Sequence, residues 1–501
     1  MVMCIRKILP LVAFLLISQF VGAQGIISNN WCGTVGFSPW LKEYQQNRAG
    51  VQYRGDDDST WLYVPMTIQI VGNDDGGGYY PLDLVFRVVC EMNEQYQDAR
   101  IRYYLVPGDA VRYLNNTKWY KHDFDGGSEL INSNRLPDRV NAFVVADPAG
   151  NCGYSWQDAI VMGKGCSTKG NSTWAHEAGH HLSLPHPFYG WEGTTWNYMQ
   201  PAPDSVGGNL VERLDGTNCY EAGDRFCDTR PDYINYRWDC DDNFESYFLQ
   251  KDPSGATFKS DATLIMGYSL DACASRFTPE QIAAMRANLH TEHSSYLQIT
   301  EPLAEIADDT MVQLISPIDS TTVQYDKFKL SWNKVPNATY YLVDVSISKN
   351  FALQMVSETV YDDTTIYVDK PIPNNRIMYW RVRAYSEWDV CQTDDNAQLG
   401  VFRTRNLSAT NELENLLVAD LTPNPVAGGS TATLLIITEE STDAQLQVTD
   451  MAGRLCQQRS VQLSSGENQL DIPTDNLQAG LYTIILRNVK GAIIRRLAVA
   501  E

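Results

Sequence analysis

Two histidines four residues apart, His176 and His180, open an eleven-residue stretch that ends at His186 and holds four of the seven histidines in the chain. On a helix, side chains at i and i+4 project from one face. The two imidazoles can therefore bind one Zn²⁺, and Glu177 beside them can reach a water on the metal. Pro185 stops such a helix. His186 can then arrive from a loop as the third ligand, leaving the fourth position open, so the stretch predicts a catalytic zinc site.

A structural zinc site is the alternative interpretation of the same histidines. Such sites are usually closed by four Cys or His ligands. A glutamate between two ligands, as Glu177 is here, has no task in a closed site, so the pattern favours catalysis. His181 faces another side of the helix, and we expect it to pack or to face solvent rather than to bind metal.

The eleven residues resemble the extended zinc-binding consensus of the metzincin peptidases, HExxHxxGxxH. One position departs from it, because Ser183 stands where the consensus has Gly. The Gly permits a left-handed turn toward the third His. A Ser in that conformation costs on the order of 1 kcal/mol.

A second group of motifs lies between 219 and 288. Met266, in an apolar run, fits the methionine that metzincins place in a tight turn beneath the zinc histidines, and Tyr268 follows two residues later. Phe277 leads into a helix that runs to about Asn288. With the cysteines at 219, 227, 240 and 273, residues 60–295 closely resemble the pappalysin (cytophagalysin-like) family. The resemblance implies a zinc endopeptidase in which Tyr268 contributes to catalysis by donating to the oxyanion.

Cysteine pairing is the next expectation. The resemblance implies disulfides among four cysteines, for which three connectivities exist; by position we favour Cys240 with Cys273, which leaves Cys219 with Cys227. Cys152 and Cys166 flank a short strand and could also pair.

The first 23 residues carry Arg6 and Lys7, an apolar run and small residues up to Ala23. This pattern predicts a secretory signal peptide. No later stretch approaches ~18 unbroken apolar residues, so we expect no transmembrane span. Export also permits the disulfides.

Residues 24–58 are polar and weakly patterned, and we expect a pro-segment. Cys32, followed by Gly33, resembles the device by which metzincin pro-segments deliver a thiolate to the open zinc position and keep the enzyme latent. The alternative is an ordinary disulfide half. Arg48 and Arg54 are plausible activation cleavage points.

The predicted fold is an α/β (α+β) metzincin-like catalytic domain over residues 59–299, followed by two all-β sandwich domains. Within the first, we expect strands at 62–71, 100–106, 139–146 and 159–162 and a helix at 81–97. Residues 311–405 show short alternating strands and look like a fibronectin type III domain. Residues 411–501 resemble the C-terminal sorting domain of the Bacteroidetes type IX secretion system, which implies contact with that secretion machinery and delivery to the cell surface or medium.

The net charge of −22 argues against nucleic acid and anionic membranes as partners. Acidic clusters at 56–58 and at Asp74 and Asp75 could hold Ca²⁺, although solvated loops are the simpler account. The sequence therefore predicts a secreted zinc endopeptidase acting on proteins or peptides. The rival interpretations are a surface adhesin with an inactive peptidase-like domain and, more weakly, another zinc hydrolase.

Overall fold

The computed structural model describes residues 25–26, 31–47, 59–307, 310–391, 397–407, 416–438, 440–488 and 491–500. The expected signal peptide, both candidate cleavage sites at Arg48 and Arg54, and the acidic cluster at 56–58 lie outside these ranges. The chain divides into two compact units: residues 1–310 with 335–340 and 384–395, and the remainder.

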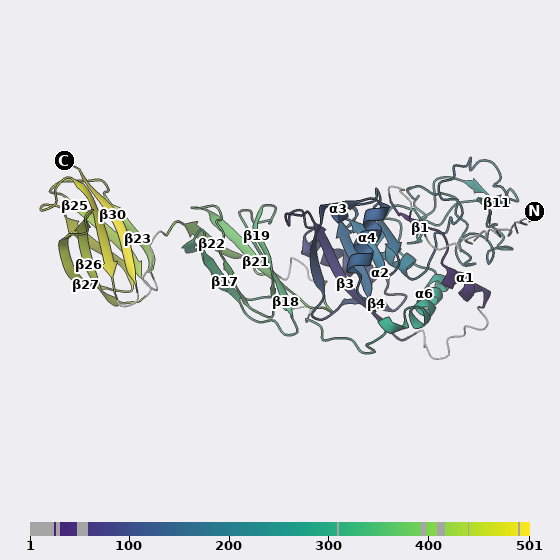
Figure 1. Cartoon of the computed structure of the whole chain (residues 1–501), viewed down its shortest axis with the longest axis horizontal. Helices are drawn as coiled ribbons and strands as arrows, with labels where there is room; N and C mark the ends of the chain where they lie inside the picture. The colour runs from purple at the N-terminus through teal and green to yellow at the C-terminus, as the bar shows by residue number, and fades with distance from the viewer. Residues whose placement is uncertain are drawn as a thin grey trace, which may run out of the picture. The chain divides into compact units, whose positions relative to one another are not determined.

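A six-stranded sheet organises the first unit (Figure 1). Its order is β4-β3-β7-β10-β9, with β5 also paired to β3. All pairs are parallel except that of β9 with β10, which is antiparallel and places β9 at the edge. The strands are β3 (Leu62–Gly72), β4 (Ile101–Leu105), β5 (Val111–Asn115), β7 (Val140–Val145), β9 (Gly153–Trp156) and β10 (Ala159–Gly163). The central strands β3, β7 and β10 are buried along their whole length, as expected for strands covered on both faces.

Helices cover this sheet. Helix α4 (Phe124–Asn134) packs Leu130 and Ile131 against Phe143 and Val145 of β7, and helix α2 (Leu82–Gln95) contacts helix α5 (Thr173–His181). The expected helix at 81–97 and the four expected strands are confirmed. Helix α4 and strands β5 and β9 were not expected, because α4 holds two glycines and the strands are short. The smaller elements are α3 (Thr117–Tyr120), β6 (Lys121–His122), β8 (Asp147–Pro148) and η1 (Lys164–Cys166).

After α5 the chain is mostly turns around a second core rich in aromatic side chains, which includes Phe188, Trp191, Tyr233 and Trp238. This part of the chain contains short strands of two residues each: β11 (Ser205–Val206), β12 (Asn209–Leu210), β13 (Gln250–Lys251) and β14 (Thr257–Phe258). Helix α6 (Pro279–Thr291) then begins with a capping box, and η2 (Ser294–Tyr296) follows it.

The segment before β3 is more ordered than its polar sequence indicated. Strand β1 (Gly25–Ile26) pairs with β2 (Thr34–Val35), and α1 (Pro39–Gln46) follows. Trp40 donates from its indole nitrogen to Thr291 Oγ1 at 2.9 Å, and Gln45 donates to the carbonyl of Arg225 at 2.9 Å. The segment folds on the surface that later residues provide, because it has too few apolar residues to form a core of its own.

Two stretches from the fibronectin-like part of the sequence belong to the first unit. Cys391 forms a disulfide with Cys90 of α2. Trp388 is 2% exposed and packs against Tyr63 and Tyr104. These contacts join residues about 300 positions apart, a long-range pairing that no local pattern indicates.

The second unit is all-β, as expected, and contains two sandwich-type pairs of sheets, each of one three-stranded and one five-stranded sheet. The first pair has orders β15-β17-β20 and β16-β22-β21-β18-β19, and the second has β23-β25-β28 and β24-β30-β29-β26-β27. The strands of the first pair are β15 (Leu314–Ser316), β16 (Thr321–Gln324), β17 (Phe328–Trp332), β18 (Tyr340–Ser346), β19 (Gln354–Tyr361), β20 (Thr365–Val368), β21 (Ile377–Tyr385) and β22 (Gly400–Arg405). Those of the second are β23 (Leu416–Thr422), β24 (Val426–Ala427), β25 (Thr431–Thr438), β26 (Thr442–Asp450), β27 (Leu455–Leu463), β28 (Gly466–Pro473), β29 (Gly480–Arg487) and β30 (Ala492–Ala500).

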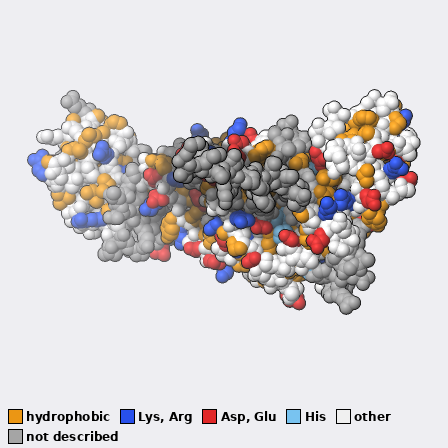
Figure 2. Space-filling model, turned by 45° about the vertical axis from the view of Figure 1, so that its right-hand side comes forward, with side chains coloured by type: hydrophobic (Ala, Val, Ile, Leu, Met, Phe, Trp, Pro, Cys, Tyr) orange, Lys and Arg blue, Asp and Glu red, His pale blue; other side chains and the backbone are white. Residues whose placement is uncertain are grey.

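Among the described residues, no helix is long and apolar enough to cross a membrane. On the face drawn in Figure 2, acidic and basic side chains are intermingled.

Candidate metal centre

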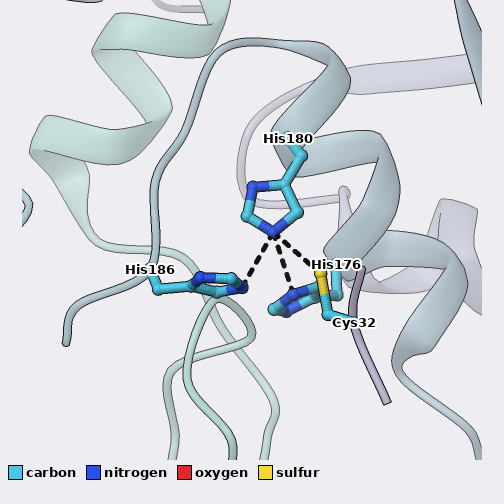
Figure 3. A group of neighbouring side chains, drawn as sticks. All are labelled: Cys32, His176, His180 and His186. Atoms are coloured by element: carbon cyan, nitrogen blue, oxygen red, sulfur yellow. Dashed lines mark hydrogen bonds between the residues drawn. The ribbon is translucent and has the colours of Figure 1, made fainter. Parts of the chain in front are cut away.

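Four side chains from three segments converge at one point: Cys32, His176, His180 and His186 (Figure 3). His180 Nε2 lies 3.1 Å from His176 Nε2 and 3.0 Å from His186 Nε2. It also lies 3.4 Å from Cys32 Sγ. Helix α5 supplies the first two imidazoles one turn apart, and the chain beyond it returns the third. The structure therefore brings together the three predicted ligands and the predicted switch cysteine.

The other nitrogen of each ring is held from outside the cluster. His176 Nδ1 lies 2.8 Å from the carbonyl of Ile265, and His180 Nδ1 lies 2.7 Å from that of Leu184. His186 Nδ1 is 3.5 Å from the carboxylate of Glu192. A carbonyl can only accept, so Nδ1 carries the proton in the first two rings and the Nε2 lone pairs face the cluster.

This arrangement fits a metal ion better than hydrogen bonding alone. His180 Nε2 has one lone pair, which cannot satisfy two imidazole nitrogens and a thiol together. Ligands about 2.0–2.3 Å from a tetrahedral zinc lie roughly 3.3–3.6 Å from one another, close to the observed separations. Burial lowers the pKa of all three histidines, that of His186 to about 3, which keeps the rings neutral as metal binding requires.

Glu177 sits beside the cluster and is fully buried. Its Oε2 accepts from Thr34 Oγ1 at 3.2 Å, while Oε1 has no hydrogen-bond partner among the described residues. Burial raises its pKa to about 8. Gly153 makes room for it, since a Cβ there would lie 3.0 Å from Glu177 Cγ and 3.2 Å from Oε1. An unpartnered buried carboxyl oxygen indicates a functional residue, because burying a polar atom without a hydrogen bond lowers the stability of the fold.

Residues 31–34 lie along β9 at the edge of the sheet. The carbonyl of Trp31 accepts from Cys152 N at 2.7 Å and from Gly153 N at 3.0 Å, and Gly33 N donates to the carbonyl of Gly153 at 2.8 Å. Cys32 thereby pairs in parallel with Gly153, the first residue of β9. Burial, and then the charge of Glu177, raises the pKa of the Cys32 thiol. A bound metal cation would reverse that effect.

Met266 lies under α5. A Cβ added to Gly179 would come within 2.5 Å of Met266 Sδ, so the absence of a side chain at 179 is what lets the methionine approach the helix. Met266 is fully buried. The structure thus places it directly beneath the helix that carries two of the three imidazoles.

Ser183 adopts φ = 75°, the left-handed conformation in which the consensus has glycine. Its hydroxyl oxygen accepts from Ser38 Oγ and from Asn288 Nδ2, each at 3.1 Å. These hydrogen bonds give a reason for a serine at this position. The departure from the consensus therefore leaves the turn toward His186 in place.

Tyr268 packs its ring 4.9 Å from that of His186, and its hydroxyl donates to the carbonyl of Cys32 at 3.3 Å. His181, by contrast, stacks on His293 at 4.8 Å, away from the cluster, in the packing role expected of it.

Asp74 and Asp75 accept from the backbone nitrogens of Thr117 and Gly77. These hydrogen bonds engage one oxygen of each carboxylate, and calcium binding there stays a prediction.

The disulfides agree with the expected pairs: Cys152–Cys166, Cys219–Cys227 and Cys240–Cys273. The fourth, Cys90–Cys391, was not expected. Cys32 is free and buried, so the alternative of a disulfide half is wrong.

Sequence reasoning missed three acidic side chains in the loop-rich region after α5. Glu192 approaches His186, and burial raises its pKa to about 7. Glu212 and Asp224 each keep one buried oxygen without a hydrogen-bond partner in the described chain, and burial raises both pKa values. The only signal available was their position in a loop-rich region, which does not indicate burial.

In a comparison with protein families, residues 421–500 match the secretion system C-terminal sorting domain. The protein is therefore a secreted protein that carries a type IX sorting domain, and the expected contact with that secretion machinery and export to the cell surface or medium follow from it. A comparison with curated proteins finds no match.

Solved structures resemble this chain over 38% of its length. They include a biofilm-associated protein BSP domain (14% identity, TM-score 0.16), dimeric latent PorU from Porphyromonas gingivalis (16%, 0.16) and the FN1–FN3 domains of chicken CNTN1 (11%, 0.17). The aligned regions cover 29%, 20% and 66% of those chains respectively.

Proposed function

We propose that this secreted protein is a zinc-dependent endopeptidase whose own residues 31–34 keep it latent. The observation that carries the proposal is the convergence of three imidazole nitrogens and the Cys32 sulfur beside the buried carboxyl of Glu177. The resemblance of residues 60–295 to pappalysins supports the same reaction class.

His176, His180 and His186 would hold the zinc. When bound, such an ion lowers the pKa of a water toward ~7 and polarises a peptide carbonyl. Glu177 accepts a proton from the attacking water and returns it to the leaving amine. Its burial and its unpartnered Oε1 suit that task, because burial raises the pKa of the carboxyl and so favours its uptake of a proton.

Tyr268 supplies a hydrogen-bond donor. Its hydroxyl already donates a hydrogen bond to the backbone carbonyl of Cys32. We assign it the same task toward the oxygen of a scissile carbonyl, where a donor stabilises developing negative charge.

Latency rests on two contacts made by one segment. Cys32 brings its sulfur to the three imidazoles and so takes the position that a water needs. Thr34 donates to Glu177 and occupies one oxygen of the base. Removal or displacement of the segment would release both groups together.

Hydrolysis assays on the purified full-length chain and on the form that results from its own processing test the proposal. We expect casein cleavage by the processed wild type that phenanthroline abolishes and added zinc restores, and no cleavage by Glu177→Ala with zinc still bound. Equal cleavage by the processed wild type and by Glu177→Ala would contradict the proposal. A wild-type chain that binds zinc yet cleaves nothing after release of residues 31–34 would favour the alternative, a surface binding protein with an inactive peptidase-like domain.

A further inference from the structure

Trp31 occupies a pocket immediately beside the cluster. The side chain is 5% exposed, and its ring centroid lies 4.5 Å from that of His176. The ring meets Tyr268 edge-on at 4.7 Å. The guanidinium carbon of Arg237 lies over the Trp31 ring, 4.2 Å from its centroid. The pocket is thus lined by a metal-ligand candidate, the candidate oxyanion donor and a cation.

Two contacts hold the guanidinium of Arg237 beside this pocket. Its Nη2 pairs with Asp271 Oδ2 at 2.9 Å, and its Nη1 donates to the carbonyl of Ser269. The second oxygen of Asp271 accepts from the backbone nitrogen of Ser172 at 3.0 Å and from its hydroxyl at 2.8 Å. Asp271 is therefore fully engaged, and the pocket presents the guanidinium of Arg237 rather than a free carboxylate.

The backbone around Trp31 lies as an added strand on the edge of the sheet. Its carbonyl accepts two hydrogen bonds from Cys152 and Gly153, and Cys32 pairs with Gly153. In recognition by strand addition, main-chain hydrogen bonds hold the peptide and pockets select alternate side chains. Trp31 fills the pocket next to the cluster in that arrangement.

We propose that the Trp31 pocket is the specificity pocket of the enzyme and that it selects a large aromatic side chain over lysine or arginine. The inference rests on the proposed endopeptidase function and names its substrate class. An aromatic ring gains a cation–π contact with Arg237 and edge contact with Tyr268. A basic side chain meets the like charge of Arg237, while the carboxylate that could receive it is already occupied by Arg237 and Ser172.

Cleavage profiling on the full-length chain tests the selection. The double variant Trp31→Ala, Cys32→Ala vacates the pocket, and peptides that differ at one position (Trp, Phe, Leu, Lys or Arg) report its preference. We expect Trp and Phe to be cleaved about ten-fold better than Lys and Arg, because a cation–π contact in a desolvated site is worth about that factor. Equal or better cleavage of the basic peptides would overturn the proposal.

Two further variants in that background assign the preference to residues. Arg237→Ala should remove the aromatic advantage and raise cleavage of the Lys and Arg peptides about ten-fold, because it frees one oxygen of Asp271. Adding Asp271→Asn should abolish the gain for basic peptides. An unchanged profile in Arg237→Ala would show that another part of the cleft selects the side chain.

A binding readout separates this inference from the proposed activity. In full-length Glu177→Ala, which cannot process itself, the labelling rate of the Cys32 thiol reports how firmly residues 31–34 are seated. We expect Trp31→Ala to label about ten-fold faster and Trp31→Phe to label at nearly the parent rate. Mass mapping distinguishes Cys32 from the exposed Cys456. Equal labelling rates for Trp31→Ala and Trp31→Phe would contradict the proposed pocket even if the enzyme is active. A wild type that shows the expected labelling pattern but has no catalytic activity would contradict only the proposed activity.

Discussion

The sulfur of Cys32 lies 3.4 Å from Nε2 of His180, although 148 positions separate the two residues. The same imidazole nitrogen is within 3.1 Å of two further histidine nitrogens. Helix α5, the loop that follows it and the N-terminal segment thus each bring a side chain to this cluster. The first two predictions follow from this arrangement.

Replacing Cys32 with Ala should raise the activity of the uncut chain at least ten-fold, because the thiol no longer competes with water for the cluster. Activity toward a fluorogenic peptide, measured before any cleavage is visible by mass spectrometry, gives the comparison. Cys456→Ser, at the exposed free cysteine, is the matched control and should leave latency unchanged. Identical basal activity in both variants would remove Cys32 from the latency mechanism.

Replacing His186 with Ala should reduce zinc from about one ion per chain to well below one, because a three-histidine site loses a third of its ligands. Elemental analysis after dialysis gives the measurement. His181→Ala is the control, since His181 stacks on His293 and lies outside the cluster. Full zinc occupancy in His186→Ala would show that the ion is held elsewhere.

Ser183 gives a prediction about strain. Ser183→Ala keeps the left-handed backbone and loses two hydrogen bonds, so the free energy of unfolding should fall by about 1–2 kcal/mol. Ser183→Gly loses the same hydrogen bonds but relieves about 1 kcal/mol of backbone strain, so it should stay closer to the wild type. Urea denaturation of both variants provides the test; a glycine variant less stable than the alanine variant would contradict this account.

The buried pair of Glu212 and Asp224 predicts a pH dependence. Burial, together with the neighbouring Asp224 carboxylate in the case of Glu212, raises their pKa values, so the folded chain retains protons that the unfolded chain has released. Their contribution to stability is then fully present below about pH 4 and is lost as pH rises through the raised pKa values. Glu212→Gln should therefore flatten the decline of the melting temperature between pH 5 and 9.

Melting curves of the wild type and of Glu212→Gln over this pH range give the measurement. A wild-type decline no steeper than that of Glu212→Gln would contradict the raised pKa values.

Trp388 predicts that the first compact unit depends on residues beyond 310. The side chain is buried against Tyr63 and Tyr104, and the guanidinium of Arg102 lies 4.2 Å from its ring centroid. Trp388→Ala should lower the free energy of unfolding by about 3–5 kcal/mol through loss of burial and the cavity left behind. Tyr247→Ala, at a residue 63% exposed, is the control and should change it by less than about 0.5 kcal/mol. Equal stability of both variants would show that Trp388 is dispensable.

The sequence by itself determined the parts whose geometry is local. His176 and His180 share a helix face because they are four apart, and the strand at 62–71, the helix at 81–97 and the alternating strands after 311 follow from short-range patterns. The positive φ of Ser183 could be anticipated because a glycine was expected at that position. The sorting domain was recognisable because its motifs lie within one contiguous stretch.

Only the tertiary structure decided the long-range relationships. It decided between the two interpretations of Cys32 by seating it against His180. It also placed the guanidinium of Arg237 over the ring of Trp31, joined Cys90 to Cys391 and buried Glu212 with Asp224. Each joins segments whose separation carries no periodic signal, or depends on burial that a loop sequence does not indicate. Such contacts form when apolar and polar surfaces from distant segments complement one another in the packed chain, which is a property of the whole fold rather than of any window of sequence.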